Sequence, residues 1–359
     1  ERRIEAPFVR TVIRANPLAP WMALVHSPAM DPMDMSRELV WPHGRAQVQR
    51  LGAMLGPVVF KQPGVPDFSP LQVAPWADEP GAAQLPGILR RLRGEWPCVP
   101  FGRTDRPDGL PDDWAARTPS DDWGHGYAAN HDWHWQAGDD PLALSIAIEL
   151  PGALGRLTRT VRAIADVPAL EITLVVEARE PCTVPIALHP TFRLDAGAVR
   201  LVVPRYRSGI TYPVSAERGV SRLAPDHSFE DLAQVTCADG GSVDLTRFPL
   251  PFDTEELLQL RDVRGPATLN YLDAGWSVLL EWEHHSLPDL MLWVSHRGRT
   301  QAPWNGRHWA LGIEPVHGVF DLGRVAAPPA GHVLADRAGI ALFPHVPRVL
   351  RYRLSAAHG

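Results

Sequence analysis

The stretch VPIALHPTFRLDAG, residues 184–197, joins a short β-type run to a histidine and a proline. The run at 184–188 is apolar, and His189, Pro190 and Phe192 follow it closely. Strand ends are places where a rigid scaffold displays chemically active side chains. The alternative interpretation of His189 is a histidine that only packs in the core. The pattern therefore predicts a β-strand whose end is a candidate functional position.

Comparable β-type runs recur along much of the chain, at 142–150, 170–179, 199–204, 276–284, 290–297 and 309–315. Several of them alternate apolar and polar residues, as half-buried antiparallel strands do. The 37 prolines and 29 glycines divide the chain into short segments, which disfavours long helices. The sequence therefore predicts an all-β fold, a large antiparallel β-sandwich with few short helices.

The whole chain, 1–359, is expected to form a single domain, with long irregular loops at about 57–120 and helical turns at 33–40 and 85–92. The loops are rich in proline, aspartate and tryptophan, with tryptophans at Trp76, Trp96, Trp114 and Trp123. Indole faces stack on sugar rings, and carboxylates accept hydroxyl protons, so these loops suit a carbohydrate cleft. The alternative is that the tryptophans only pack the loops.

Composition narrows the classes of function. The net charge of −6 and pI near 6.2 give no basic surface for nucleic acid, and no apolar run is long enough to span a membrane. Cys98, Cys182 and Cys237 are too few and too dispersed for a disulfide framework, so a cytoplasmic location is expected. No secretory-signal pattern opens the sequence. Lys61, the single lysine, lies in a proline-rich loop, so Schiff-base chemistry is set aside.

Two further stretches carry candidate chemistry. The segment WALGIEPVHG, 309–318, places Glu314 in an apolar strand, where a carboxylate is costly to bury unless it is paired or functional. A structural ion pair with an arginine is the alternative for Glu314. The segment WGHGYAANHDWHW, 123–135, contains three histidines, His125, His131 and His134. Their spacing leaves a zinc site open as a minor alternative.

Four segments in order resemble motifs of the aldose 1-epimerase (galactose mutarotase-like) superfamily, nearest its hexose-6-phosphate mutarotase-like branch. They are HGYAA at 125–129 with the preceding GEWPCVPFGRT, LHPTFRL at 188–194, PFDTEELLQL at 251–260 and LGIEP at 311–315. The resemblance covers about residues 40–355. It implies a β-supersandwich with its site on a concave sheet face, and a sugar mutarotase that uses no cofactor and no metal.

The resemblance also implies roles for particular residues. Glu314 would be the base and His189 the acid, on opposite sides of a pyranose ring, and His125 would hydrogen-bond the ring oxygen or O1. Asp253 would orient sugar hydroxyls. We include Arg103, Trp123 and Asn130 among the substrate-binding candidates.

The chain departs from the family pattern at Ala129, where the branch usually has an arginine. Arg103, Arg106 and Arg117 remain as candidates for binding an anionic substituent. Two other functions stay open: a carbohydrate-binding or regulatory protein on the same fold, and a glycoside hydrolase or lyase in which Asp253 supplies a second carboxylate. The expected partner is a small sugar, and the expected assembly is a monomer or homodimer.

Overall fold

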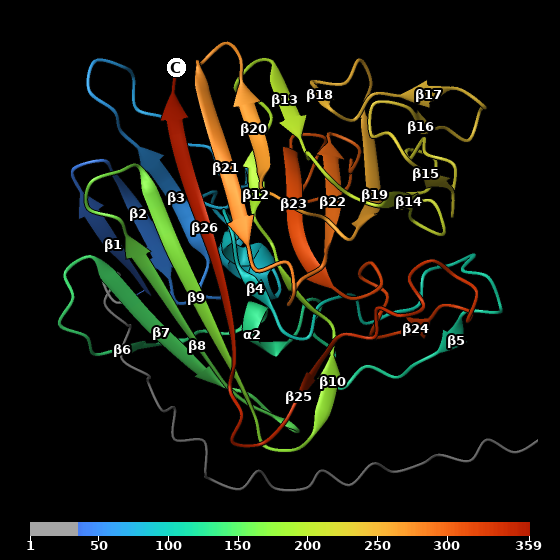
Figure 1. The fold of residues 1–359 in the computed structure, drawn as a ribbon, viewed down its shortest axis with the longest axis horizontal. Coiled ribbons are helices and arrows are strands. Elements are labelled where there is room, and N and C mark those ends of the chain that lie inside the picture. The colour runs from blue at the N-terminus through green and yellow to red at the C-terminus, as the bar shows by residue number, and fades with distance from the viewer. Residues whose placement is uncertain (1–34) are drawn as a thin grey trace, which may run out of the picture.

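The computed structural model describes residues 35–359, and within them two large antiparallel sheets face each other (Figure 1). One sheet has nine strands in the order β18-β13-β20-β21-β26-β9-β8-β7-β6. Its strands are β18 (Arg247–Phe248), β13 (Val199–Val202), β20 (Ala267–Tyr271), β21 (Trp276–Trp282), β26 (Arg348–His358), β9 (Ala169–Ala178), β8 (Leu154–Ala163), β7 (Ala143–Glu149) and β6 (His134–Gln136).

The second sheet has eight strands in the described chain, in the order β15-β14-β19-β22-β23-β11-β4, and β12 also pairs with β23. Its strands are β15 (Ser228–Phe229), β14 (Ser208–Thr211), β19 (Thr254–Arg261), β22 (Asp289–His296), β23 (Trp309–His317), β11 (Ile186–Leu188), β4 (Pro97–Cys98) and β12 (Thr191–Arg193). The all-β antiparallel sandwich predicted from the sequence is thus confirmed, and each of the seven predicted runs contains a strand.

Smaller elements complete residues 35–359. A three-stranded sheet is formed by β1 (Ser36–Trp41), β2 (Gly44–Gln49) and β3 (Leu55–Phe60), and two-stranded pairs by β10 (Cys182–Val184) with β25 (Ile340–Leu342), β16 (Val235–Thr236) with β17 (Ser242–Val243), and β24 (Ala326–Ala327) with β5 (Ala115–Ala116). The helices are 3₁₀ turns η1 (Ala82–Gln84) and η2 (Gly87–Arg91) and one α-helical turn, α2 (Tyr127–Asn130).

The helical turn predicted at 85–92 is confirmed as η2, but the one predicted at 33–40 is wrong from residue 36 onward. Residues 33 and 34 lie outside the described residues. The segment from Ser36 is strand β1, paired with β2 over its whole length, and its Leu39 and Trp41 are buried. Pairing with a neighbouring strand decides the conformation here, because local propensity is weak.

The core between the two large sheets is one continuous apolar cluster. It draws on both sheets, for example Leu174 and Leu354 from one and Leu258, Leu292 and Leu311 from the other. A second apolar cluster packs on the other side of the eight-stranded sheet, under the loops of residues 57–120 and 318–338. The eight-stranded sheet is therefore covered on both faces.

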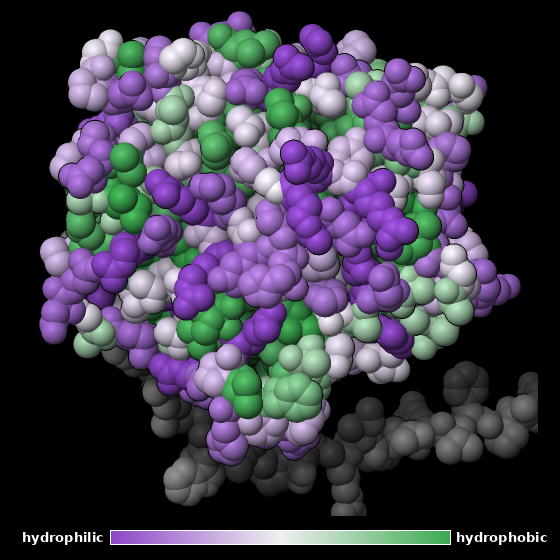
Figure 2. Space-filling view, viewed as in Figure 1, coloured by the Kyte–Doolittle hydropathy of each residue, from purple (hydrophilic) through white to green (hydrophobic). Residues whose placement is uncertain are grey.

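Figure 2 shows polar and apolar residues interspersed on the face of the molecule in this view. Cys98, Cys182 and Cys237 are all free thiols in the structure. Among the described residues, no helix has the length and hydropathy needed to cross a membrane.

Candidate active site

A cavity of about 420 Å³ opens between the eight-stranded sheet and the loops that cover it. Ligand sites are typically concave, mostly apolar and furnished with a few polar groups. Side chains from the sheet, from η2 and from loop 122–125 line the cavity; they include Trp96, Trp123, His125, Asn130, His189, Trp293, Arg299, Trp304, Glu314 and Asp321. The structure thus brings five of the predicted site residues to one place: Glu314, His189, His125, Trp123 and Asn130.

His189 and Glu314 face each other at the bottom of this cavity. Nε2 of His189 lies 3.3 Å from Oε1 of Glu314. The pairing of β11 with β23 explains the contact, because Ile186 pairs with His317, and the same register continued places His189 opposite Glu314. The sequence predicts the two groups on opposite sides of a sugar, and this prediction is wrong, because they are cross-strand neighbours.

The orientation of His189 is fixed from several directions. Its backbone N–H donates to the carbonyl of Trp96 at 2.9 Å, and its ring stacks on the Trp96 indole with centroids 4.1 Å apart. Nδ1 lies 3.2 Å from the hydroxyl of Thr191. The chain therefore ends strand β11 with an imidazole whose Nε2 is aimed at Glu314.

Glu314 is fully buried, and neither of its carboxyl oxygens has a hydrogen bond of good geometry within the protein. Gly312, two residues earlier on β23, makes room for it, because a Cβ at that position would come within 2.5 Å of Oε1. An unpaired buried carboxylate is costly, so such a group persists where it has a use. Among the described residues no arginine forms an ion pair with Glu314, whose nearest charge partner is His189.

Burial sets the protonation of this pair. It raises the pKa of Glu314 well above its ordinary value, and Asp321 adds a repulsive charge that acts in the same direction. Burial lowers the pKa of His189 well below its ordinary value, and His125 contributes further. Both shifts favour a protonated carboxyl beside a neutral imidazole over a carboxylate beside an imidazolium.

His125 reaches the cavity from a strained turn. Its φ is 60°, in the left-handed region, and its ring meets that of His189 edge-on with centroids 5.3 Å apart. Burial, with Arg324 and Arg299 nearby, lowers the pKa of His125 to about 4. A neutral His125 can donate or accept a hydrogen bond in the cavity without carrying charge.

Asn130 holds this turn in place. Its amide nitrogen donates to the carbonyls of Gly124 and Gly126, at 2.7 and 2.8 Å, and its oxygen accepts from the backbone N–H of Ile88. The side chain lines the cavity, but both of its donors and its acceptor are engaged by the backbone. Asn130 was expected to bind substrate; the structure makes it a residue that positions His125.

Arg299 brings a cation to the cavity and was missed by the sequence analysis. Its guanidinium lies over the Trp293 and Trp304 rings, 5.5 and 4.8 Å from their centroids. Its Nε is 3.2 Å from the buried carboxyl of Glu255. Arg299 lies in a loop segment, HRGRT, that carries no distinctive local pattern.

Asp321, also missed, lines the cavity from the turn that follows β23. Its Oδ1 accepts a hydrogen bond from the Tyr212 hydroxyl at 2.7 Å. Burial raises the pKa of this carboxyl, while Arg103 and the Tyr212 hydroxyl act against that rise. No local pattern in the sequence distinguishes Asp321, because it lies in a turn beyond the end of β23.

Other predicted binding residues lie elsewhere. Asp253 is outside the cavity lining, more than half exposed, and paired with Arg297 at 2.6 Å. Arg103 also lies outside the lining and pairs with Asp105, although its backbone N–H donates to the carbonyl of Asp321.

The remaining anion-binding candidates are used inside the loops. Arg106 donates to the carbonyls of Trp114, Leu110 and Pro111, and Arg117 to the carbonyl of Gly323. The hydrolase alternative required Asp253 as a second carboxylate beside Glu314. Asp253 lies outside the cavity lining, so it does not take that place.

The histidines of the zinc alternative separate in the structure. His125 lines the cavity, His131 stacks on Tyr127, and His134 is exposed on β6. Among residues 35–359, no group of three or more histidine, cysteine, aspartate or glutamate side chains is arranged to hold a metal ion.

The fold is that of known sugar-epimerase-like proteins. A candidate aldose 1-epimerase from Escherichia coli K12 superposes with a TM-score of 0.60 at 16% identity, covering 90% of this chain and 99% of that one. An aldose epimerase homologue from C. elegans and a galactose mutarotase-like protein from Clostridium acetobutylicum each give 0.58, at 13% and 14% identity, covering 90% of this chain and 98% and 95% of theirs. No protein-family model and no curated protein sequence matches the chain.

Proposed function

We propose that the protein is a sugar mutarotase of the aldose 1-epimerase type, which interconverts the α and β anomers of a hexose by acid–base ring opening. The observation that carries this proposal is the buried Glu314–His189 pair, whose facing atoms are 3.3 Å apart in a tryptophan-lined cavity. The fold shared with proteins described as aldose 1-epimerases and galactose mutarotases supports it.

The geometry suits a hemiacetal because O1 and the ring oxygen are attached to the same carbon. Neutral His189 takes the proton from the O1 hydroxyl while protonated Glu314 gives its proton to the ring oxygen. The bond between C1 and the ring oxygen breaks, and an open-chain aldehyde forms. The pair is then a carboxylate beside an imidazolium.

Ring closure reverses these steps. After rotation about the C1–C2 bond, the carboxylate takes the proton from the former ring hydroxyl, which attacks C1. The imidazolium protonates the carbonyl oxygen. The pair returns to its starting state with no net gain or loss of protons. These roles are the reverse of those expected from the sequence, because burial favours the neutral form of both groups.

The charges in the cavity favour an uncharged sugar. Asp122, Glu314 and Asp321 line it, and Arg299 is already paired with Glu255 and, at 3.6 Å, with Glu217. A phosphate would meet carboxyl groups and a cation that is already neutralised. We therefore expect a free hexose to be preferred to its 6-phosphate by at least about tenfold in kcat/KM.

The test is exchange NMR of anomer interconversion, with glucose, galactose, their 6-phosphates and a sulfonated hexose. Wild type is expected to accelerate exchange of a free hexose, and Glu314→Gln and His189→Asn to abolish the acceleration. Glu281→Gln, exposed on β21, and His134→Asn, exposed on β6, make the same chemical changes on the other sheet and are expected to keep full activity. Sugar resonances that broaden with no acceleration in wild type would instead favour a carbohydrate-binding protein.

A further inference from the structure

Asp321 is a partly buried carboxyl group that lines the cavity, with Arg103 as its nearest charge partner and the Tyr212 hydroxyl as its side-chain hydrogen-bond donor. The Tyr212 hydroxyl, 2.7 Å from Oδ1, occupies one acceptor site of a group that has about four. Acceptor-only groups are the natural partners of sugar hydroxyls, which are donors. The rest of the lining is largely aromatic and aliphatic, so Asp321 stands out as a polar group not used by the acid–base pair.

The side-chain amide of Gln259 binds the turn that carries Asp321 at two points. Oε1 of Gln259 on β19 accepts the backbone N–H of Phe320 at 2.8 Å, and its Nε2 donates to the carbonyl of Gly318 at 3.0 Å. Phe320 has φ of 46°, an unfavourable conformation for a bulky residue that the surroundings must hold. Gln259 therefore clamps the two residues that set the path of the chain into Asp321.

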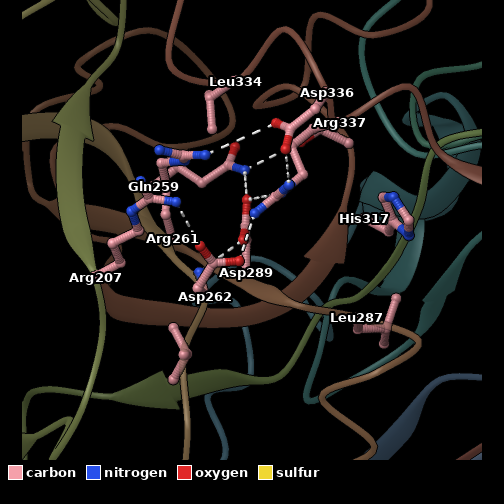
Figure 3. A network of polar contacts seen from close by, with 12 residues as sticks. Arg207, Gln259, Arg261, Asp262, Leu287, Asp289, His317, Leu334, Asp336 and Arg337 are labelled. Atoms are coloured by element: carbon pink, nitrogen blue, oxygen red, sulfur yellow. Dashed lines mark hydrogen bonds and ion pairs between the residues drawn. The ribbon is translucent and has the colours of Figure 1, made fainter.

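Gln259 is itself fixed by a charged network beside this turn (Figure 3). Its Nε2 also donates to Oδ2 of the fully buried Asp289, at 2.8 Å. The same oxygen accepts from Nε of Arg337 at 2.9 Å, and Arg337 reaches Asp262 at 2.7 Å. The amide has its donors and acceptor assigned by these partners, so it cannot rotate without losing several hydrogen bonds.

We propose that Asp321 binds a hydroxyl group of the sugar, and that Gln259 is a positioning residue that sets Asp321 for this contact. The inference rests on the proposed function only in that the ligand is a sugar. It assigns to Asp321 the hydroxyl-orienting role that the sequence analysis gave to Asp253, which lies outside the cavity.

Asp321→Asn is the first test, because asparagine keeps the shape and an acceptor for Tyr212. Affinity for a hexose, measured by titration calorimetry or ligand-observed NMR, is expected to fall about 10- to 100-fold, the usual loss for a hydrogen bond to a charged group. Where exchange is measurable, KM should rise by a similar factor while kcat changes little. Asp253→Asn, an identical change outside the cavity, is expected to leave both values unaltered.

A series of monodeoxy hexoses identifies the contact. For the sugar that lacks the hydroxyl bound by Asp321, wild type should already show the loss, and Asp321→Asn should add nothing. Losses that add for every deoxy sugar would overturn the proposal that Asp321 touches a hydroxyl.

Gln259→Met tests the positioning role, with Gln136→Met on the edge strand β6, away from the cavity, as its control. The expected result is the loss of affinity and the rise in KM seen in Asp321→Asn, with kcat little changed and no further loss in the double variant. Additive losses in the double variant would show that Gln259 acts by another route. Because binding is measured apart from exchange, a protein that binds sugars without accelerating exchange would refute the mutarotase proposal and leave the Asp321 test intact.

Discussion

The two large sheets bury their strands in different ways. In the nine-stranded sheet, β8, β21 and β26 alternate buried and more exposed residues, because one face packs on the core and the other faces solvent. In the eight-stranded sheet, β22 is buried along its whole length and β23 along all but its two ends. The second face of this sheet is covered by loops instead of water.

That difference decides where charged groups are found. The eight-stranded sheet buries Glu255, Gln259, Asp289 and Glu314, each at 0% exposure. The nine-stranded sheet buries Arg159, which is neutralised by Glu95 and hydrogen-bonded to Tyr352. Of these groups, Glu314 lines the cavity, Glu255 pairs with the lining residue Arg299, and Gln259 binds the turn that carries Asp321. The alternating sheet acts as a scaffold. Four changes test this contrast.

The largest effect is expected at the cavity. Glu314→Gln should lower the exchange rate by about 10²–10⁴-fold, the usual contribution of a general acid or base. The free energy of unfolding should change by less than about 1 kcal/mol, because Glu314 has no hydrogen bond of good geometry to lose. Exchange NMR and chemical denaturation measure the two quantities. A loss of several kcal/mol in the free energy of unfolding would make Glu314 a structural residue. The eight-stranded sheet would then not differ from the nine-stranded sheet in this respect.

In the nine-stranded sheet, a core substitution should lower stability and leave activity unchanged. Leu174 on β9 is fully buried in the shared core, so Leu174→Ala should lower the free energy of unfolding by about 2–5 kcal/mol. The exchange rate per folded molecule should stay at the wild-type value. Glu171→Ala, exposed on the same strand, is the control and should change neither quantity. A large loss of activity in folded Leu174→Ala would show that the core of the scaffold couples to the site.

The sequence predicted the scaffold where strand patterns were local. The runs at 170–179 and 276–284 alternate clearly and became β9 and β21. The run at 348–358 alternates equally well, with Leu350, Tyr352, Leu354 and Ala356 buried, and could have been found from its period. Strand β1 could not, because its conformation depends on pairing with β2.

The site was predicted to the extent that its residues lie on strands. His189 and Glu314 were found because one ends a β-type run and the other is a charge inside an apolar run. Arg299 and Asp321 lie in loops and are positioned by groups distant in the sequence, Glu255 for the first and Gln259 for the second. No local pattern records such contacts, and the same reason explains why Asp253 was placed in the site wrongly.

The third change tests whether the Glu314 carboxyl group needs the space that Gly312 leaves beside it. Gly312→Ala places a Cβ within 2.5 Å of Oε1 of Glu314 and 3.0 Å of Cβ of Trp293. Oε1, the atom that faces His189, must shift, and small displacements of a reacting group cost about 10- to 100-fold in rate. Gly138→Ala, where a Cβ meets nothing within 4 Å, is the matched control. Unchanged exchange kinetics in Gly312→Ala would show that the 3.3 Å contact is not needed for activity.

The smallest effect is expected in the pH dependence of the free energy of unfolding. His308, buried beside Trp293 and bonded to Ser295, has its pKa lowered by burial to about 3. Between pH 6.5 and 3 the unfolded chain therefore binds more protons at this residue than the folded chain does, so His308 makes stability fall as the pH falls. In His308→Gln, the slope of unfolding free energy between pH 6 and 4.5 should decrease by about 1 kcal/mol per pH unit.

His134→Gln, on the exposed strand β6, should leave that slope unchanged. Denaturation curves at several pH values for both variants give the comparison directly. Equal slopes in wild type and His308→Gln would mean that His308 is as easily protonated in the folded protein as in the unfolded chain. The loop-covered face of the eight-stranded sheet would then admit water, and the low dielectric that favours a neutral Glu314–His189 pair would be lost with it.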